Sequence, residues 1–186
     1  MICWRIRANQ KNVIARHPKV ASKLRAEFVR WFKDVTDGVE YSPVRIPVGH
    51  RQSIGVEISP SWSKWTGANI NYTFDGYDWD TIDGWKEPGE KAVWRLDVQA
   101  SGQYSIRLSY GCRPLTAGGR IRISSGDESV EHMVRPTTTA EQFDVFDVGQ
   151  IKLELGPSEL TAEVVSSNGG ELMRLNKVIL KRVNVK

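Results

Sequence analysis

Aromatic and acidic side chains crowd residues 60–85 in a pattern that suits the binding of a sugar. An aromatic face can stack on the C–H face of a sugar ring, while carboxylates hydrogen-bond its hydroxyl groups. The rings that we predict to bind a glycan are Trp62, Trp65, Tyr72, Trp79 and Trp85. The alternative is that most of these rings complete the hydrophobic core of a small domain, as large aromatic side chains often do.

The aspartates of the same stretch offer oxygen ligands of the kind that Ca²⁺ prefers. They are Asp75, Asp78, Asp80 and Asp83, and they lack the full pattern of an EF-hand loop. His17, His50 and His132 lie too far apart to give metal-ligand spacing. Since no Ser/His/Asp or Cys/His arrangement stands out, we expect no catalytic residue, no metal ligand and no cofactor in this chain.

Residues 9–37 predict one amphipathic helix. Pro18 suits its first turn, where a missing N–H costs nothing, and Gly38 suits its end. Apolar residues recur at spacings of three and four, at Val20, Leu24, Phe28, Trp31/Phe32 and Val35. A stripe this wide needs a partner surface, which is either the domain that follows or another domain.

Short alternating runs follow, separated by turn residues. Clear examples are Trp94 to Val98 and Tyr104 to Tyr110, with residues 100–103 between them as a hairpin turn. Many short strands with period-2 alternation indicate an antiparallel sandwich with one buried face on each sheet. We therefore predict a mainly β fold, an antiparallel β-sandwich with one N-terminal amphipathic α-helix.

The predicted organisation has three parts: a helical segment at 1–40, an extended linker or edge strand at 41–50, and the sandwich at 51–186. Residues 1–40 contain nine basic and four acidic residues, an excess of five positive charges against a total of +4 for the chain. Nucleic-acid binding would need a basic stripe on a known module, so we expect no nucleic-acid partner. No apolar run reaches the roughly 20 residues of a membrane helix, so we expect no membrane partner. The first residues also lack the apolar region of a signal peptide.

Two sets of residues follow patterns known from other proteins. The helical segment contains Ile6-Arg7-Ala8, Gln10, Asn12-Val13, His17-Pro18, Val20 and Leu24. This pattern is similar to the end of the catalytic domain of arylsulfatases. The part that follows contains Val93 to Val98, then Gly102, Tyr104, Ile106, Leu108, Tyr110 and Cys112, and later Leu153–Gly156, Leu160–Val164 and Leu175–Leu180. This second pattern resembles the jelly-roll, galactose-binding-like domain found after some bacterial sulfatases, and also carbohydrate-binding modules of the same class.

Both resemblances imply the C-terminal region of a bacterial arylsulfatase, with calcium and formylglycine only in the full enzyme. Cys112-Arg113-Pro114 does not supply the formylglycine motif, because Leu115 and Thr116 follow where an arginine is required. Cys112 is instead expected to end a strand.

The predicted function is a non-catalytic accessory region that supports a sulfatase catalytic domain or binds substrate glycan. The alternatives are a stand-alone carbohydrate-binding module, and a sulfuric ester hydrolase that is competent only as part of a longer chain. The expected partners are a glycan or sulfated glycan, which the basic side chains of Lys19, Lys23, Arg30 and Lys33 would favour, and a sulfatase domain packed on the helix. The compartment would be periplasmic or extracellular if such a parent enzyme is exported.

Overall fold

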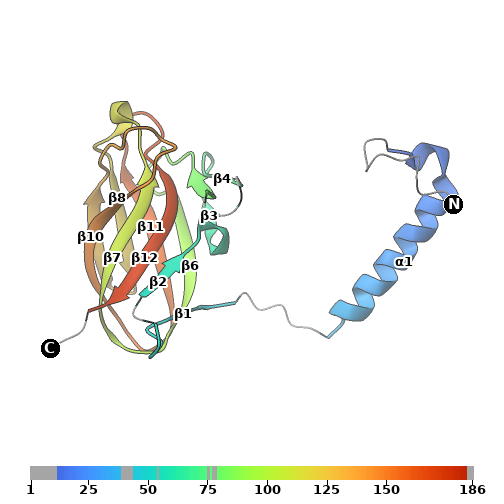
Figure 1. Ribbon diagram of the computed structural model, residues 1–186, viewed down its shortest axis with the longest axis horizontal. Helices are drawn as coiled ribbons and strands as arrows, with labels where there is room; N and C mark the ends of the chain where they lie inside the picture. The colour runs from blue at the N-terminus through green and yellow to red at the C-terminus, as the bar shows by residue number, and fades with distance from the viewer. Residues whose placement is uncertain (1–11, 39–43, 54, 75, 77–78, 184–186) are drawn as a thin grey trace. The chain divides into compact units, whose positions relative to one another are not determined.

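The computed structural model describes residues 12–38, 44–53, 55–74, 76 and 79–183. The chain divides into two compact units, residues 1–42 and residues 43–186 (Figure 1). The first contains the only long helix of the described residues, and the second contains all of their strands. Each unit is described by itself below.

The helical unit has a 3-10 turn, Ile14–Arg16, followed by helix α1, Pro18–Thr36. The helix begins at the predicted proline, with His17 as the N-cap, and Gly38 follows its C-terminal cap with a φ of +76°. Residues 12–17, which were predicted to be helical, lie outside α1. Among the described residues, no helix combines the length and apolar character needed to cross a membrane.

The apolar stripe of α1 is present as predicted, and the helical unit taken by itself buries none of its members. Phe28 is the centre of an aromatic group, with ring centroids 5.7 Å from Trp31 and 6.0 Å from Phe32. Exposed apolar clusters of this kind mark surfaces that contact other molecules or domains.

The described residues of the second unit form two facing sheets of six strands each (Figure 1). The first sheet has the order β1-β6-β11-β8-β9, with β3 also paired to β6, and the second has the order β10-β7-β12-β5-β4, with β2 paired to β12. The strands of the first sheet are β1 Ile46–Val48, β3 Lys64–Thr66, β6 Lys91–Val98, β8 Arg120–Ser125, β9 Glu128–Met133 and β11 Gly156–Ser166. The strands of the second are β2 Gly55–Ile58, β4 Asn71–Thr73, β5 Thr81–Asp83, β7 Gly102–Gly111, β10 Asp144–Leu153 and β12 Arg174–Arg182.

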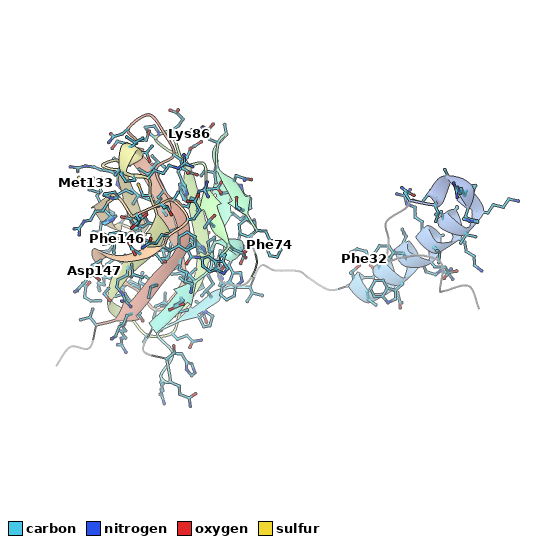
Figure 2. All side chains as sticks on the ribbon, turned by 45° about the horizontal axis from the view of Figure 1, so that its top comes forward. Phe32, Phe74, Lys86, Met133, Phe146 and Asp147 are labelled. Carbon is cyan, nitrogen blue, oxygen red and sulfur yellow. The ribbon has the colours of Figure 1, made fainter. Side chains whose placement is uncertain are left out.

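Alternation along the strands fills the space between the sheets. In β6, every second residue from Ala92 to Val98 is buried, and the residues between them face outward. The largest fully buried side chains are Trp85, Trp94, Tyr104 and Tyr110. Phe146 of β10 packs against this core, whereas Phe74 projects from the side of the sandwich (Figure 2). The predicted mainly β sandwich with one N-terminal helix is confirmed.

One detail differs from the sequence prediction. Residues 100–103 do not form a hairpin turn, because β6 and β7 belong to different sheets and the chain passes from one sheet to the other between them. Of the two alternatives for residues 41–50, a linker or an edge strand, residues 46–48 form edge strand β1, which pairs with β6 in parallel. The aromatic stretch contributes the short strands β3, β4 and β5.

Candidate glycan-binding cleft

A cleft of about 610 Å³ lies on the outer face of the second sheet. Ser109 places it there, because the neighbours Leu108 and Tyr110 on β7 point into the core and alternate residues of a strand face opposite sides. We call this feature the Trp79 cleft. Its lining residues are Trp79, Ser109, Glu141, Gln142, Phe143, Asn176 and Lys177.

The two aromatic rings of the cleft come from distant parts of the chain. Trp79 precedes β5, and Phe143 directly precedes β10. Their ring centroids are 6.2 Å apart and their planes are inclined by 46°. Trp79 remains 58% exposed, so most of the indole is available for contact with a ligand.

Asp80 fixes the backbone beside Trp79. One carboxylate oxygen accepts the Gly76 N–H at 2.9 Å, and the other accepts the Tyr72 hydroxyl at 2.8 Å. Burial, followed by the hydrogen bond to Asp80, raises the pKa of Tyr72, so this hydroxyl keeps its proton at neutral pH. The main-chain carbonyl of Asp80 accepts a third hydrogen bond from Asn176 Nδ2, at 3.2 Å. The tryptophan is therefore held at a defined place above the sheet.

The floor of the cleft and part of its walls are polar. Ser109 Oγ donates to Asn176 Oδ1 at 3.2 Å, and both residues are almost fully buried. Lys177 Nζ lies 3.0 Å from Glu57 Oε2, and Arg174 Nη1 lies 3.2 Å from Glu141 Oε1. An open cleft with one large aromatic face and several ordered hydrogen-bonding groups is suited to binding a polyhydroxylated ligand.

The predicted glycan-binding residues do not form one platform. Trp65, 41% exposed, stacks on Tyr72 with ring centroids 6.0 Å apart and an angle of 20°. Trp62, 60% exposed, lies between two smaller depressions of about 400 and 470 Å³ on the side of the first sheet. Only Trp79 lines the large cleft.

Trp85 is a core residue. Its side chain is fully buried, and its indole N–H donates to the carbonyl oxygen of Ile82 at 2.9 Å. A ring with no exposed surface cannot stack on a sugar, so we remove Trp85 from the candidate site. The alternative of core packing describes this residue.

The acidic stretch gives no metal site among the residues that the structure describes, where no group of three or more His, Cys, Asp or Glu is arranged to hold an ion. Asp80 and Asp83 instead accept hydrogen bonds from Tyr72 and Thr73. Asp75 and Asp78, the other two aspartates of this stretch, lie outside the described residues.

Cys112 directly follows β7 and is 1% exposed, as expected for a residue that ends a strand. Burial raises the pKa of its thiol, which disfavours the thiolate. Its backbone N–H donates to Thr137 Oγ1 at 2.8 Å. These contacts describe a structural cysteine. Cys3 lies outside the described residues.

The sandwich shares its fold with carbohydrate-binding modules. A module from Cellvibrio mixtus lichenase 5A, solved in complex with cellotriose, has a TM-score of 0.55 and 14% identity over 69% of this chain and 98% of that one. The C-terminal module of a laminarinase from Zobellia galactanivorans has a TM-score of 0.54 and 14% identity over 69% of this chain and 99% of that one. These structures confirm the jelly-roll class of the sandwich.

The same fold also occurs in the Cry4Aa larvicidal toxin from Bacillus thuringiensis, with a TM-score of 0.57 and 12% identity over 70% of this chain and 24% of the toxin. No protein-family model and no curated protein matches the sequence. The fold is thereby defined, and the resemblance of residues 6–24 to arylsulfatases stays a prediction.

Proposed function

We propose that the sandwich is a glycan-binding module and that the Trp79 cleft is its binding site. The observation that carries this proposal is the 58% exposed indole of Trp79, set against Phe143 above an ordered polar floor. The sugar stacks on the indole, and its hydroxyl groups accept hydrogen bonds from Lys177 and exchange them with the amide of Gln142. The likeness to modules that include a cellotriose complex supports this function without showing it.

The proposal is tested by isothermal titration calorimetry on the full chain. Cellotriose and β-1,3-galactotriose are suitable first ligands. Cellotriose is bound in a solved module of this fold. The galactotriose is present in a solved exo-β-1,3-galactanase, 29% of which matches this fold. Soluble polysaccharides in affinity gels extend the search. We expect binding to at least one of these glycans, and a complete lack of binding across the panel would contradict the function.

Two tryptophan variants test whether the glycan binds in the Trp79 cleft, independently of whether the sandwich binds glycans at all. Trp79→Ala is expected to lower affinity by at least about tenfold, since a central aromatic contact carries much of the binding energy. Trp62→Ala removes a ring of nearly the same exposure, 60% against 58%, and is expected to stay within twofold of the parent. The reverse result would keep glycan binding and move the site to the first sheet.

A second role, accessory to a catalytic domain such as a sulfatase, is favoured by the apolar stripe of α1. That stripe is not buried within its own unit, and such surfaces commonly contact another domain. The module would then direct a neighbouring enzyme to its glycan, and the chain by itself would not hydrolyse a sulfate ester. DNA sequence upstream of the Met1 codon tests the parentage, because it requires an in-frame sulfatase domain there.

A further inference from the structure

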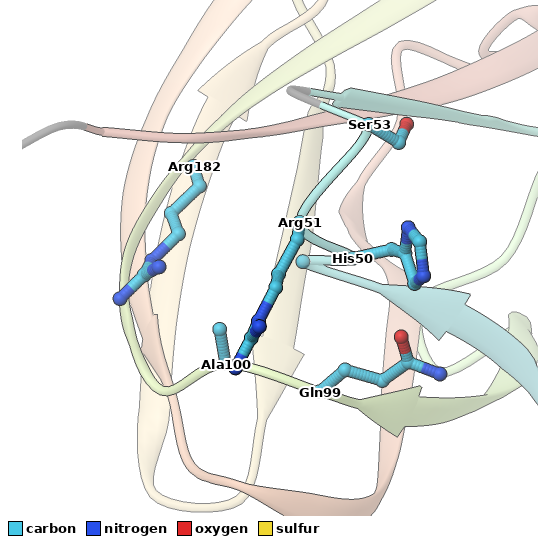
Figure 3. A pocket seen from close by; sticks show the side chains of 7 residues that line it. His50, Arg51, Ser53, Gln99, Ala100 and Arg182 are labelled. Atoms are coloured by element: carbon cyan, nitrogen blue, oxygen red, sulfur yellow. The ribbon is translucent and has the colours of Figure 1, made fainter.

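A second pocket, of about 420 Å³, lies at the end of the sandwich where the chain crosses from β6 to β7 (Figure 3). Three segments meet there: the loop between β1 and β2, the β6–β7 crossing, and the end of β12. We call it the basic pocket. The lining residues used below are Gly49, His50, Arg51, Ser53, Gln99 and Arg182.

The frame of this pocket is built from main-chain contacts. Gln99 N–H donates to the carbonyl of Val48 at 2.8 Å, and Ser53 N–H closes a turn onto the carbonyl of His50 at 3.0 Å. Gly49 has a φ of +81°, and a side chain there would lie 2.1 Å from Tyr104 Oη. The loop therefore sits against the crossing at a distance that only glycine permits.

The groups presented by the basic pocket are mainly donors. Figure 3 shows the Arg51 side chain extending over Ala100, with Arg182 on one side of it and His50 and Gln99 on the other. Arg182 Nη2 donates to the carbonyl of Ser101 at 2.9 Å, which orders the guanidinium without neutralising it. No ion pair involves Arg51 or Arg182 within the described part of the chain.

The histidine and glutamine add to this set. His50 Nδ1 accepts the Gln52 N–H at 3.2 Å, so the proton of the neutral ring lies on Nε2, which becomes a donor. Gln99 Nε2 lies 3.4 Å from Asp97 Oδ2, a long contact that leaves its second N–H available. Among the residues that the structure describes, no Asp or Glu lines the pocket.

We propose that the basic pocket binds an oxyanion, the sulfate or carboxylate group of an acidic polysaccharide. Two guanidinium groups match the paired oxygens of such a group, and the described lining holds no carboxylate that would repel it. This site is separate in residues from the Trp79 cleft. A polysaccharide bound there would add a charge-dependent contact to the neutral sugar contact of the proposed function. Binding at the basic pocket does not depend on that function.

The test measures binding of the full chain to dextran sulfate and to alginate, which carry sulfate alone and carboxylate alone. The variant is Arg51→Gln/Arg182→Gln. The charge-matched control is Lys86→Gln/Arg113→Gln, at two exposed side chains of the sandwich outside the pocket, which also removes two positive charges. Thermal melts of all three proteins check that each is folded.

The pocket variant is expected to weaken binding of one or both polyanions by about tenfold or more, since each charged hydrogen bond lost is worth about that factor. The control is expected to change it less than twofold. Loss with one polyanion alone identifies the group recognised. Equal loss in both variants, or no binding of either polyanion at low salt, would overturn the proposal. Trp79→Ala is measured alongside: it should leave polyanion binding unchanged even if no neutral glycan binds.

Discussion

The hydroxyl of Tyr110 and Nε2 of His132 lie 2.9 Å apart and share a hydrogen bond that joins the two sheets inside the core. Tyr110 belongs to β7 and His132 to β9. The same hydroxyl accepts the backbone N–H of Arg135 at 2.9 Å, and the tyrosine ring stacks on Phe146 with centroids 4.5 Å apart. Burial raises the pKa of Tyr110 to about 12. The Tyr110–His132 pair is therefore uncharged at neutral pH, and its contacts are made within the core.

The buried imidazole makes stability depend on pH. Burial, followed by the charge of Arg135, lowers the pKa of His132 below its ordinary value of 6.5. As pH falls through about 6.5, His132 becomes protonated in the unfolded chain but stays neutral in the folded chain. The free energy of unfolding therefore decreases until the pH reaches the lowered pKa of the folded state. Urea unfolding at pH 7.5 and 5.5 measures the loss. We expect His132→Phe to reduce that difference, whereas His17→Gln on α1 leaves it unchanged. An unaltered difference in His132→Phe would contradict the assignment.

Trp62 and Trp85, the first and last residues of the predicted glycan site, should differ in how much each contributes to the stability of the fold. Trp85→Ala empties a fully buried volume and removes the donor to Ile82, so it is expected to cost about 3–5 kcal/mol. Trp62→Ala changes an exposed ring and should cost about 0.5 kcal/mol or less. Denaturant unfolding measures both. Similar values for the two variants would contradict the burial found for Trp85.

Local patterns in the sequence predict the strands well and their pairing poorly. The alternation in β6 and β7 is visible because one face of each strand is buried. The turn between them, residues 100–103, has the composition of a hairpin, and nothing local distinguishes a hairpin from a crossing between sheets. Pairing is decided by which strands can cover the common core, which involves residues far apart in sequence.

The candidate site shows the same division. Clustered aromatics indicate where a sugar would bind, and Trp79 is among them. The residues that turn Trp79 into a cleft, Phe143 and Asn176, are more than 60 positions away and carry no motif. Composition also cannot separate Trp79 from Trp85, because both stand in the same polar stretch and only the path of the chain buries one of them.

The division of the chain into two units predicts independent folding of the sandwich. A fragment of residues 43–186 retains every strand of the described structure, including the edge strand β1. We expect its thermal midpoint to match that of the sandwich transition in the full chain within about 2 °C, because a domain with its own core folds by itself. Differential scanning calorimetry measures it. A clear drop in the fragment would show that the helical unit stabilises the sandwich.

The ionised carboxylate of Glu90 should stabilise the loop before β6 by accepting hydrogen bonds from that loop. Its almost fully buried carboxylate accepts N–H bonds from Asn69, Lys86 and Glu87. Burial opposes ionisation, but together these bonds outweigh it and lower the pKa below 4.5. The stabilisation is present above pH 4.5 and is lost as pH falls toward the lowered value.

Glu90→Gln keeps the shape of the side chain and turns its amide nitrogen toward main-chain donors. We expect a loss of about 1–3 kcal/mol at pH 7 by urea unfolding, because buried donors are left without partners. The loss should shrink as pH falls below 4.5. Glu154→Gln, on an exposed side chain, is the control and should change stability little. A loss independent of pH would contradict the role of the charge.

Gly111 connects the packing of the sandwich to the Trp79 cleft. A side chain at this position would lie 2.0 Å from the carbonyl oxygen of Ala140, and that residue directly precedes the wall of the cleft formed by residues 141–143. Gly111→Ala must displace this main-chain segment, at a cost of about 1–3 kcal/mol. It should also weaken binding of whichever glycan the cleft takes, since Phe143 moves with the segment.

Gly126→Ala, at a turn with open space and a φ of +57°, is a suitable control. It should cost about 1–2 kcal/mol of strain and leave glycan affinity unchanged. Equal effects of the two variants on glycan affinity would contradict the prediction that packing against Ala140 positions the wall of the cleft.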